Sequence, residues 1–183
     1  VPEKFRPLRF PVIHGRVTDI DGTPLEAEVL AEKLGSEKIL ARAKSSLPDG
    51  KFTMTVPPGM RYGLHANKAN YAPVSISLDL TKNTGAPAHE VRLTLVPLQA
   101  GNKIRLNNVF FASNSAELNK ISHSELNRLV LLMKANRSLN IEIAGHTDGD
   151  GQASANLDLS RRRAQSVAAY FEAAAVIISM LCG

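Results

Sequence analysis

The pattern of apolar residues changes near residue 100, and this change limits the chain to two kinds of structure. Before it, short runs of alternating apolar and polar residues are separated by turn signals such as Asp21-Gly22 and Asp49-Gly50. After it, apolar residues recur at helical spacing. A chain of 183 residues with 44% apolar content can form two small cores. We therefore expect two domains, residues 1–98 and 99–183, joined by a hinge within residues 97–102.

The first hundred residues are predicted to be all β. Alternation is clearest at residues 52–56, where apolar residues alternate with threonines until Pro57-Pro58 ends the run. The predicted strands are residues 10–17, 25–30, 39–43, 52–56, 62–66, 74–80 and 91–96. About seven short strands at this spacing are typical of a β-sandwich, so we expect a seven-stranded sandwich.

The second half is predicted to begin as a β-α-β-α unit. Residues 108–111 and 139–143 have strand character, and residues 122–125 form a capping box ahead of the first helix. Asn136 can end that helix in a left-handed conformation. The apolar stripes of the two helices are Leu126, Leu129, Val130 and Met133, then Ala164, Val167, Ala168 and Phe171. A β-α-β order implies a parallel strand pair with a right-handed crossover.

One acidic and one basic residue lie on either side of the turn that leads into the second helix. Asp148 follows the apolar segment 141–144, and Arg163 comes fifteen residues later, early in the helix. A carboxylate and a guanidinium that face one pocket can hold a small zwitterion, because each pairs with the opposite charge of the ligand. In open α/β sheets, ligands bind beyond the carboxyl ends of strands, where this turn is expected.

Several short sequence pieces stand in a characteristic order in the second half. They are Val109-Phe110-Phe111, residues 114–118, Ser124-Glu125-Leu126, residues 141–148, Asn156, and Leu159-Ser160 with Arg163-Ala164. Together they make residues 102–171 resemble the OmpA-like C-terminal domain, the peptidoglycan-binding module of Gram-negative envelope proteins. The resemblance implies that Asp148 and Arg163 clamp the diaminopimelate of the cell-wall peptide. It also implies that Asn156, Thr147 and Asn114 belong to the binding site.

The chain departs from the family pattern in two places. Many family members have an aspartate after the aromatic of the first strand, where this chain has Ala112, so we expect one loop contact to be missing. The family continues through a third strand, a further helix and a last strand, of which residues 176–178 are expected to begin at most one. We therefore expect a C-terminally incomplete domain of marginal independent stability, because a small core buries little area.

Turn glycines, prolines and aromatics also recur in a fixed order in the first half. They are Gly15-Arg16-Val17, Asp21-Gly22 with Pro24-Leu25, Asp49-Gly50 with Phe52, Val56 with Pro58-Gly59 and Tyr62, and Asn70-Tyr71. This set resembles the carboxypeptidase regulatory-like, or transthyretin-like, domain. The resemblance implies a seven-stranded sandwich that serves as a spacer or interaction module without enzymatic activity of its own.

The other chemistry-bearing residues favour neither a catalytic nor a metal site. His146 has no second His or Cys at ligand spacing, and the acidic loop at residues 148–151 lacks the later ligands of a calcium loop. The serines lack the context of a nucleophile elbow. The formal charge of +5 favours approach to anionic surfaces, but no basic stripe with interleaved aromatics indicates nucleic acid. We expect no catalytic residue, metal or cofactor.

These observations lead to one expected function and two alternatives. We expect a non-enzymatic protein of the periplasm, at the periplasmic face of the outer membrane, that binds peptidoglycan. It would tether the outer membrane or an envelope assembly to the wall, with outer-membrane or envelope proteins as further partners. The first alternative is an interaction or scaffold module that no longer binds the wall because its domain is truncated. The second is an accessory domain of a hydrolase.

Overall fold

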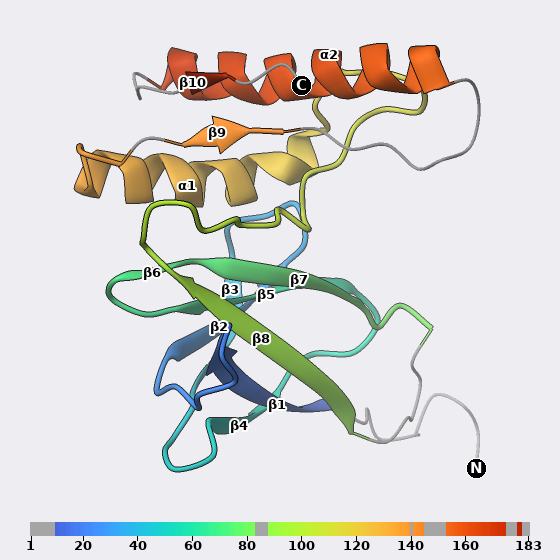
Figure 1. Cartoon of the computed structure of the whole chain (residues 1–183). Coiled ribbons are helices and arrows are strands. Elements are labelled where there is room, and N and C mark those ends of the chain that lie inside the picture. Colours follow the sequence, from blue (N-terminus) through green and yellow to red (C-terminus); the bar gives the residue numbers. More distant parts are fainter. Residues whose placement is uncertain (1–9, 83–87, 140, 145–152, 175–178, 181–183) are drawn as a thin grey trace, which may run out of the picture. The chain divides into compact units, whose positions relative to one another are not determined.

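The chain forms two compact units, Val1–Asn108 and Val109–Gly183. The computed structural model describes residues 10–82, 88–139, 141–144, 153–174 and 179–180 (Figure 1). Each unit has its own set of buried apolar side chains. The assignment of the two predicted domains to residues 1–98 and 99–183 stays a prediction.

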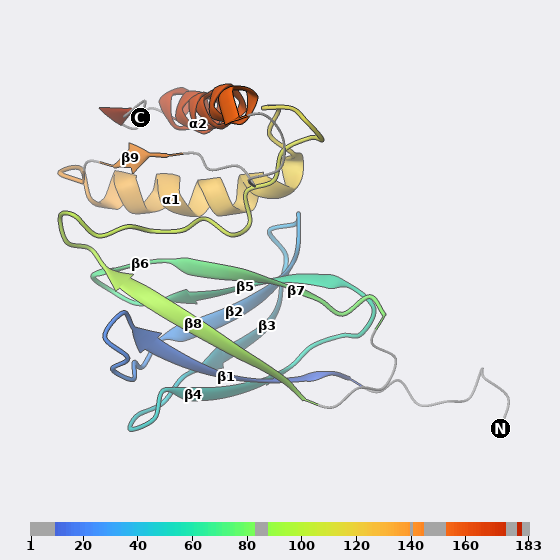
Figure 2. The same ribbon diagram turned by 45° about the vertical axis from the view of Figure 1, so that its right-hand side comes forward.

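Unit 1 is all β, and its described residues form two four-stranded sheets (Figures 1 and 2). The strands are β1 (Val12–Asp19), β2 (Glu28–Lys33), β3 (Ile39–Lys44), β4 (Lys51–Thr55), β5 (Arg61–Asn67), β6 (Tyr71–Ala72), β7 (Val74–Asp79) and β8 (His89–Pro97). One sheet has the order β4-β1-β8-β6 and the other β3-β2-β5-β7. The predicted all-β character is confirmed, whereas the count of seven strands and the sandwich type are not.

β6 is a strand that the sequence pattern does not predict, and it follows a turn at Asn70. Asn70 adopts a left-handed conformation with φ 66°, which asparagine tolerates better than most residues. The chain then pairs Tyr71 with Pro97 and Ala72 with Val96 of β8. A two-residue strand of this kind depends on its partner strand, because so few residues carry no alternation of their own.

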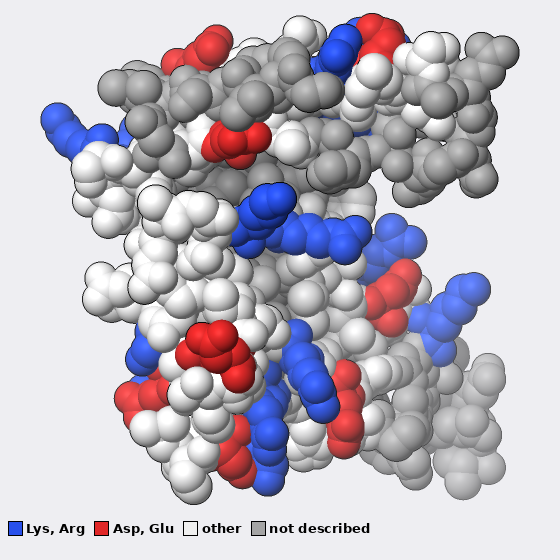
Figure 3. Space-filling view, in the orientation of Figure 1, with Lys and Arg blue, Asp and Glu red and all other residues white. Residues whose placement is uncertain are grey.

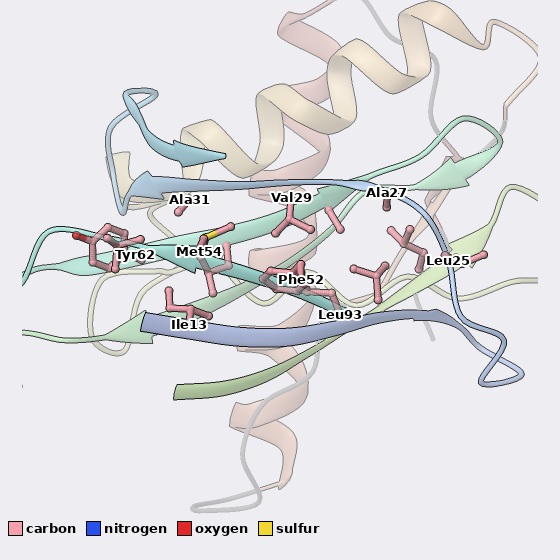
Figure 4. Close-up of a cluster of buried hydrophobic side chains, with 14 of the residues drawn as sticks. Ile13, Leu25, Ala27, Val29, Ala31, Phe52, Met54, Tyr62 and Leu93 are labelled. Carbon is pink, nitrogen blue, oxygen red and sulfur yellow. The ribbon is translucent and has the colours of Figure 1, made fainter. Parts of the chain in front are cut away.

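The inward faces of the two sheets supply one buried apolar cluster (Figure 4). Along β4, for example, Phe52 and Met54 are buried while Lys51 and Thr53 are exposed. The fully buried members of the cluster are Ile13, Val17, Val29, Ala31, Val56, Tyr62, Leu64, Ala66, Leu80, Leu93 and Leu95. Removal of this apolar surface from water is the largest favourable contribution to the folding of such a unit.

Gly15 is required by the packing of this cluster against β1. It stands directly opposite Phe52 in the antiparallel pairing of β1 with β4. A Cβ atom at Gly15 would lie 2.3 Å from two atoms of the Phe52 ring. Any larger residue would displace the ring, so this glycine is a packing requirement as well as part of the sequence pattern of the first half.

The described residues of unit 2 form two α-helices, α1 (His123–Ala135) and α2 (Ala153–Ala173), with a 3-10 turn, η2 (Lys120–Ser122), ahead of α1. Both predicted apolar stripes are buried, namely Leu126, Leu129, Val130 and Met133 on α1 and Ala164, Val167, Ala168 and Phe171 on α2. The Tyr170 hydroxyl also donates a hydrogen bond to Asn127 Oδ1 at 2.9 Å, which links the helices. Neither helix has the combined length and apolar character that would let it cross a membrane, within the residues described.

The strands of unit 2 differ from the prediction. β9 (Glu142–Ile143) pairs in parallel with β10 (Ser179–Met180). Residues 108–111 form no strand, and Phe111 makes only an isolated bridge with Leu118. The predicted parallel pair between residues 108–111 and 139–143 is therefore absent from the described part of the chain. The predicted strand start at residues 176–178 lies outside the described residues.

Residues 108–111 form no strand because residues just before α1 hydrogen-bond to the backbone amide and carbonyl of Phe110. The buried Ser122 hydroxyl accepts a hydrogen bond from the Phe110 amide at 2.7 Å and donates one to its carbonyl at 3.0 Å. The Asn119 amide donates to the same carbonyl at 2.9 Å. Backbone groups that already have these hydrogen-bond partners do not require a neighbouring strand to supply them.

The two ends of α1 are also capped differently from the prediction. The Ser122 side chain makes no capping hydrogen bond, because it is engaged with Phe110. Asn136 has φ −126° and is not left-handed, and its Nδ2 donates to the Leu132 carbonyl at 2.8 Å. The capping box and the left-handed ending are therefore wrong, although α1 does begin after Ser122 and end before Asn136.

Candidate functional site

The guanidinium group of Arg163, on α2, is held between a loop and an aromatic ring. Its Nε donates a hydrogen bond to the Ser115 carbonyl at 3.1 Å. Its Cζ lies 5.0 Å from the centre of the Phe111 ring. The side chain is half-buried. A charge-assisted hydrogen bond and a cation–π contact together fix the plane of the group before any ligand is present.

The loop that receives Arg163 is closed by its own hydrogen bonds. The Ser115 amide donates to the Ala112 carbonyl at 3.1 Å, and the Ala112 amide donates to the Glu117 carbonyl at 3.0 Å. Asn114, at the exposed tip, has φ 48°, a conformation that suits asparagine. The Glu117 amide donates to Ser115 Oγ at 3.0 Å. These bonds direct the Ser115 carbonyl toward α2.

Asn156 lies on the same side of α2 as Arg163. The two residues are seven positions apart, which is about two turns of helix. Asn156 is half-buried. Between them, Ser160 is buried and its hydroxyl donates to the Leu157 carbonyl at 2.9 Å. The helix therefore presents Asn156 and Arg163 on one face, as the predicted site requires.

Only one of the three consecutive arginines contacts the loop. Arg161 is exposed. Arg162 pairs with Asp158 one turn earlier at 2.9 Å, and both side chains are more than half exposed, at 54% and 66%. Arg163 alone points to the Asn114–Ser115 loop, because the 100° turn between successive helical residues sends its neighbours elsewhere.

The five predicted site residues fall into two groups. Asn114, Asn156 and Arg163 are described, and Arg163 contacts the residue next to Asn114. Thr147 and Asp148 lie outside the described residues. The pairing of Asp148 with Arg163 at one ligand therefore stays a prediction.

Phe111 and Ser115 both contact the Arg163 side chain, and neither was among the predicted site residues. An aromatic residue at the edge of a polar loop is a general cation–π candidate, so the sequence carries a weak signal for Phe111. Ser115 acts through its backbone carbonyl. No side-chain pattern can reveal a contact made by a carbonyl group.

Comparison with known proteins gives a family match within unit 2, whereas the chain has only low sequence identity to the solved structures that it matches. The model of the OmpA family matches residues 110–180. No curated protein is similar enough in sequence to match the chain. The match includes α1, α2, β9 and the loop that holds Arg163.

Among solved structures, the chain is similar to one described as "The Bacillus anthracis TIE protein", at 11% identity and a TM-score of 0.41, covering 49% of this chain and 17% of that chain. It is also similar to two interface mutants of a type II cohesin–X-dockerin complex from Acetivibrio cellulolyticus, each covering 87% of this chain and 94% of that chain. Their identities are 15% and 16%, with TM-scores of 0.32 and 0.28. Scores this low do not define a fold. The chain thus carries an OmpA family domain at residues 110–180, preceded by an all-β region.

Proposed function

We propose that this chain binds peptidoglycan non-covalently through diaminopimelate and has no enzymatic activity. OmpA family domains generally bind peptidoglycan, which supports a cell-wall tethering role and an association with the cell envelope or periplasm. In the proposed complex, Arg163 pairs with a carboxylate of diaminopimelate and Asp148 pairs with its ammonium group. Asn156, Asn114 and Thr147 supply neutral hydrogen-bonding groups around them.

The observation that carries this proposal is the way in which Arg163 is held. Within the described residues, its only hydrogen bond uses Nε, so no described residue takes up the donors of the two terminal nitrogens. A carboxylate can accept two parallel hydrogen bonds from this end of a guanidinium group. Because Ser115 and Phe111 already restrict the side chain, ligand binding costs less conformational entropy than it would at a solvated arginine.

Unit 1 fits a supporting role in this proposal. Its two sheets are consistent with a carboxypeptidase regulatory-like domain, which we interpret as a spacer or interaction module. The wall-binding unit would then connect the cell wall to the outer membrane or to an envelope assembly from the periplasmic side. Outer-membrane or envelope proteins are the partners that we propose for the remainder of the chain.

Sedimentation with purified sacculi tests the proposal. The whole chain should co-sediment with sacculi that contain diaminopimelate, and Arg163→Ala should reduce the bound fraction strongly. Arg162→Ala removes the same charge from a side chain that faces Asp158 rather than the loop, so it should bind like the wild type. If the wild-type chain stays in the supernatant, the wall-binding proposal is wrong and the interaction or scaffold function takes its place. If both variants lose binding equally, recognition depends on positive charge in general.

A further inference from the structure

Three basic side chains lie in one row across the outer face of a sheet in unit 1. Arg16 of β1 has Lys51 of β4 directly opposite on one side and Arg92 of β8 directly opposite on the other. All three residues are exposed. Figure 3 shows Lys and Arg side chains close together over β1 and β8, with acidic side chains near them. Like charges directly opposite one another destabilise a sheet, so an anion bound over this row would relieve the repulsion.

The row lines an open hollow of about 440 Å³. His14 and Glu90, which face one another across β1 and β8, line it from the adjacent row. The two rows are separated by two residues along the strand, or about 6.6 Å. The hollow thus has a strongly basic side and, one row away, a carboxylate.

The acidic groups near the row neutralise only part of its charge. Asp49 pairs with Lys51 at 2.7 Å, and the hydrogen bond from Lys51 is the main reason why the pKa of Asp49 is lowered. Arg16 adds a weaker electrostatic effect on the pKa of the same carboxyl group. Among the described residues, the side chains of Arg16 and Arg92 make no hydrogen bond and no ion pair within 4.0 Å. No described residue therefore takes up the donors of these two guanidinium groups.

We infer that this hollow binds a phosphate ester, and that a phosphoethanolamine group fits it best. Two guanidinium forks side by side match the oxygens of a phosphate group, which accepts bidentate hydrogen bonds. The adjacent carboxylate of Glu90 would repel a second negative charge but attract an ammonium group. A ligand that carries an amine next to its phosphate satisfies both sides. The site lies within unit 1 and is independent of the wall-binding proposal.

Titration of the full chain with free phosphoethanolamine, followed by calorimetry or NMR, tests this inference. Binding should be saturable, and the double variant Arg16→Gln/Arg92→Gln should weaken it at least about tenfold. The matched control is Arg42→Gln/Arg61→Gln. It removes the same charge from exposed arginines of the other sheet, which pair with Glu28 and Asp79. This control should bind like the wild type.

Glu90 provides a second test, in which two ligands should respond in opposite directions. Glu90→Gln should weaken binding of phosphoethanolamine, because the ammonium loses its partner, and should strengthen binding of glycerol phosphate, because a repulsion is removed. Each change is expected to be about threefold, since exposed charge pairs contribute little. If Glu90→Gln changes the affinity for both esters in the same direction, the pairing of the ligand ammonium with Glu90 is wrong.

A third experiment distinguishes the two possible sources of the phosphate group, a lipid headgroup and a soluble ester. Vesicles that contain phosphatidylethanolamine should bind the chain and be displaced by free phosphoethanolamine if the source is a lipid headgroup. Binding of the free ester without vesicle binding assigns a soluble ester, and either result supports the site. The Tm of Arg16→Gln/Arg92→Gln should rise, because the repulsion between the two arginines is removed, while its ligand binding falls. A variant that lost binding because it unfolded would show a lower Tm instead. Absence of saturable binding to either ester, or equal loss in the matched control, overturns the inference.

Discussion

The Nε atom of Arg163 and the carbonyl oxygen of Ser115 lie 3.1 Å apart, although the two residues are separated by 48 positions in the sequence. This bond joins α2 to the loop that precedes α1. It holds a half-buried guanidinium group against the residue that follows Asn114. A basic group held in this way is better suited to selective recognition than a solvated arginine, because its orientation is fixed in advance.

Arg163→Lys is expected to weaken binding to sacculi about tenfold, because lysine keeps the charge but lacks the fork that a carboxylate accepts. It also loses the bond to Ser115. Arg161→Lys and Arg162→Lys should bind like the wild type, since both side chains are exposed. Sedimentation at several salt concentrations measures the effect. Three substitutions with equal effects would mean that the arginines act as a general positive patch.

Asp148→Ala is expected to reduce affinity for diaminopimelate-type peptidoglycan by about tenfold to more than a hundredfold. This corresponds to roughly 1.5–3 kcal/mol, the usual cost of losing a hydrogen bond to a charged group. Asp158→Ala is the matched control, because Asp158 is exposed and pairs with Arg162. Calorimetry with a soluble muropeptide gives both affinities. Retained binding in Asp148→Ala would remove this residue from the site.

Muropeptides with diaminopimelate should bind more tightly than those with lysine at the same position. Lysine lacks the extra carboxylate, so Arg163 would be left desolvated without a partner, and sites built around a polar group reject ligands that lack it. The preference should shrink in Arg163→Ala, whose discriminating group is gone. Fluorescence titration with the two muropeptides provides the measurement. Equal affinities in the wild type would show that recognition depends on the glycan or on bulk charge.

Ser122→Ala should destabilise unit 2 by about 1–3 kcal/mol, because the Phe110 amide loses its hydrogen-bond partner and the Phe110 carbonyl keeps only the Asn119 amide. The Ser122 side chain is fully buried. Ser166→Ala is the control, since the hydroxyl of Ser166 only bonds to the Arg162 carbonyl of its own helix in an exposed position. Urea denaturation followed by circular dichroism measures both. A neutral Ser122→Ala would mean that water replaces the hydroxyl group.

The stability of unit 1 should fall in acid through Asp79. The Thr81 side chain is the main cause that lowers the pKa of Asp79 below its ordinary value of 3.8, with the Thr81 amide and Arg61 adding to the effect. Because the pKa is lower in the folded state, the stabilisation is present above pH 3.8 and is lost as the pH falls through the folded-state pKa.

Asp79→Asn should therefore be less stable than the wild type near neutral pH and should lose less stability in acid. Urea midpoints measured from about pH 6 to about pH 2.5 show the difference between the two curves. Asp21→Asn, at an exposed turn, controls for the change in net charge. Parallel curves for the wild type and Asp79→Asn would exclude Asp79 as the cause.

The sequence predicts the elements whose pattern repeats along the chain. The helical stripe from Leu126 to Met133 is buried as predicted, and so is the stripe from Ala164 to Phe171. The alternation around Phe52 and Met54 likewise identifies β4. These predictions succeed because the period of a helix or a strand fixes which side chains share a face, and that period is visible in the chain itself.

The resemblance of the sequence to the OmpA family is also what selects Arg163 among three consecutive arginines as a predicted site residue. Its contacts with Phe111 and the Ser115 carbonyl come from the tertiary structure. Helical geometry explains why Arg161 and Arg162 point elsewhere, since each residue is turned by 100° from the one before it. Which of the three arginine side chains reaches the loop depends on how α2 packs in the folded unit.

Other features were decided by tertiary structure alone. Residues 108–111 have the composition of a strand, yet the buried Ser122 hydroxyl binds both backbone groups of Phe110. β6 exists only because β8 lies beside it, and β10 only because β9 does. Local patterns determine which residues can be buried together. Backbone hydrogen bonds between distant segments determine where each strand forms, because every buried amide and carbonyl must find a partner and the nearest available one depends on the packed fold.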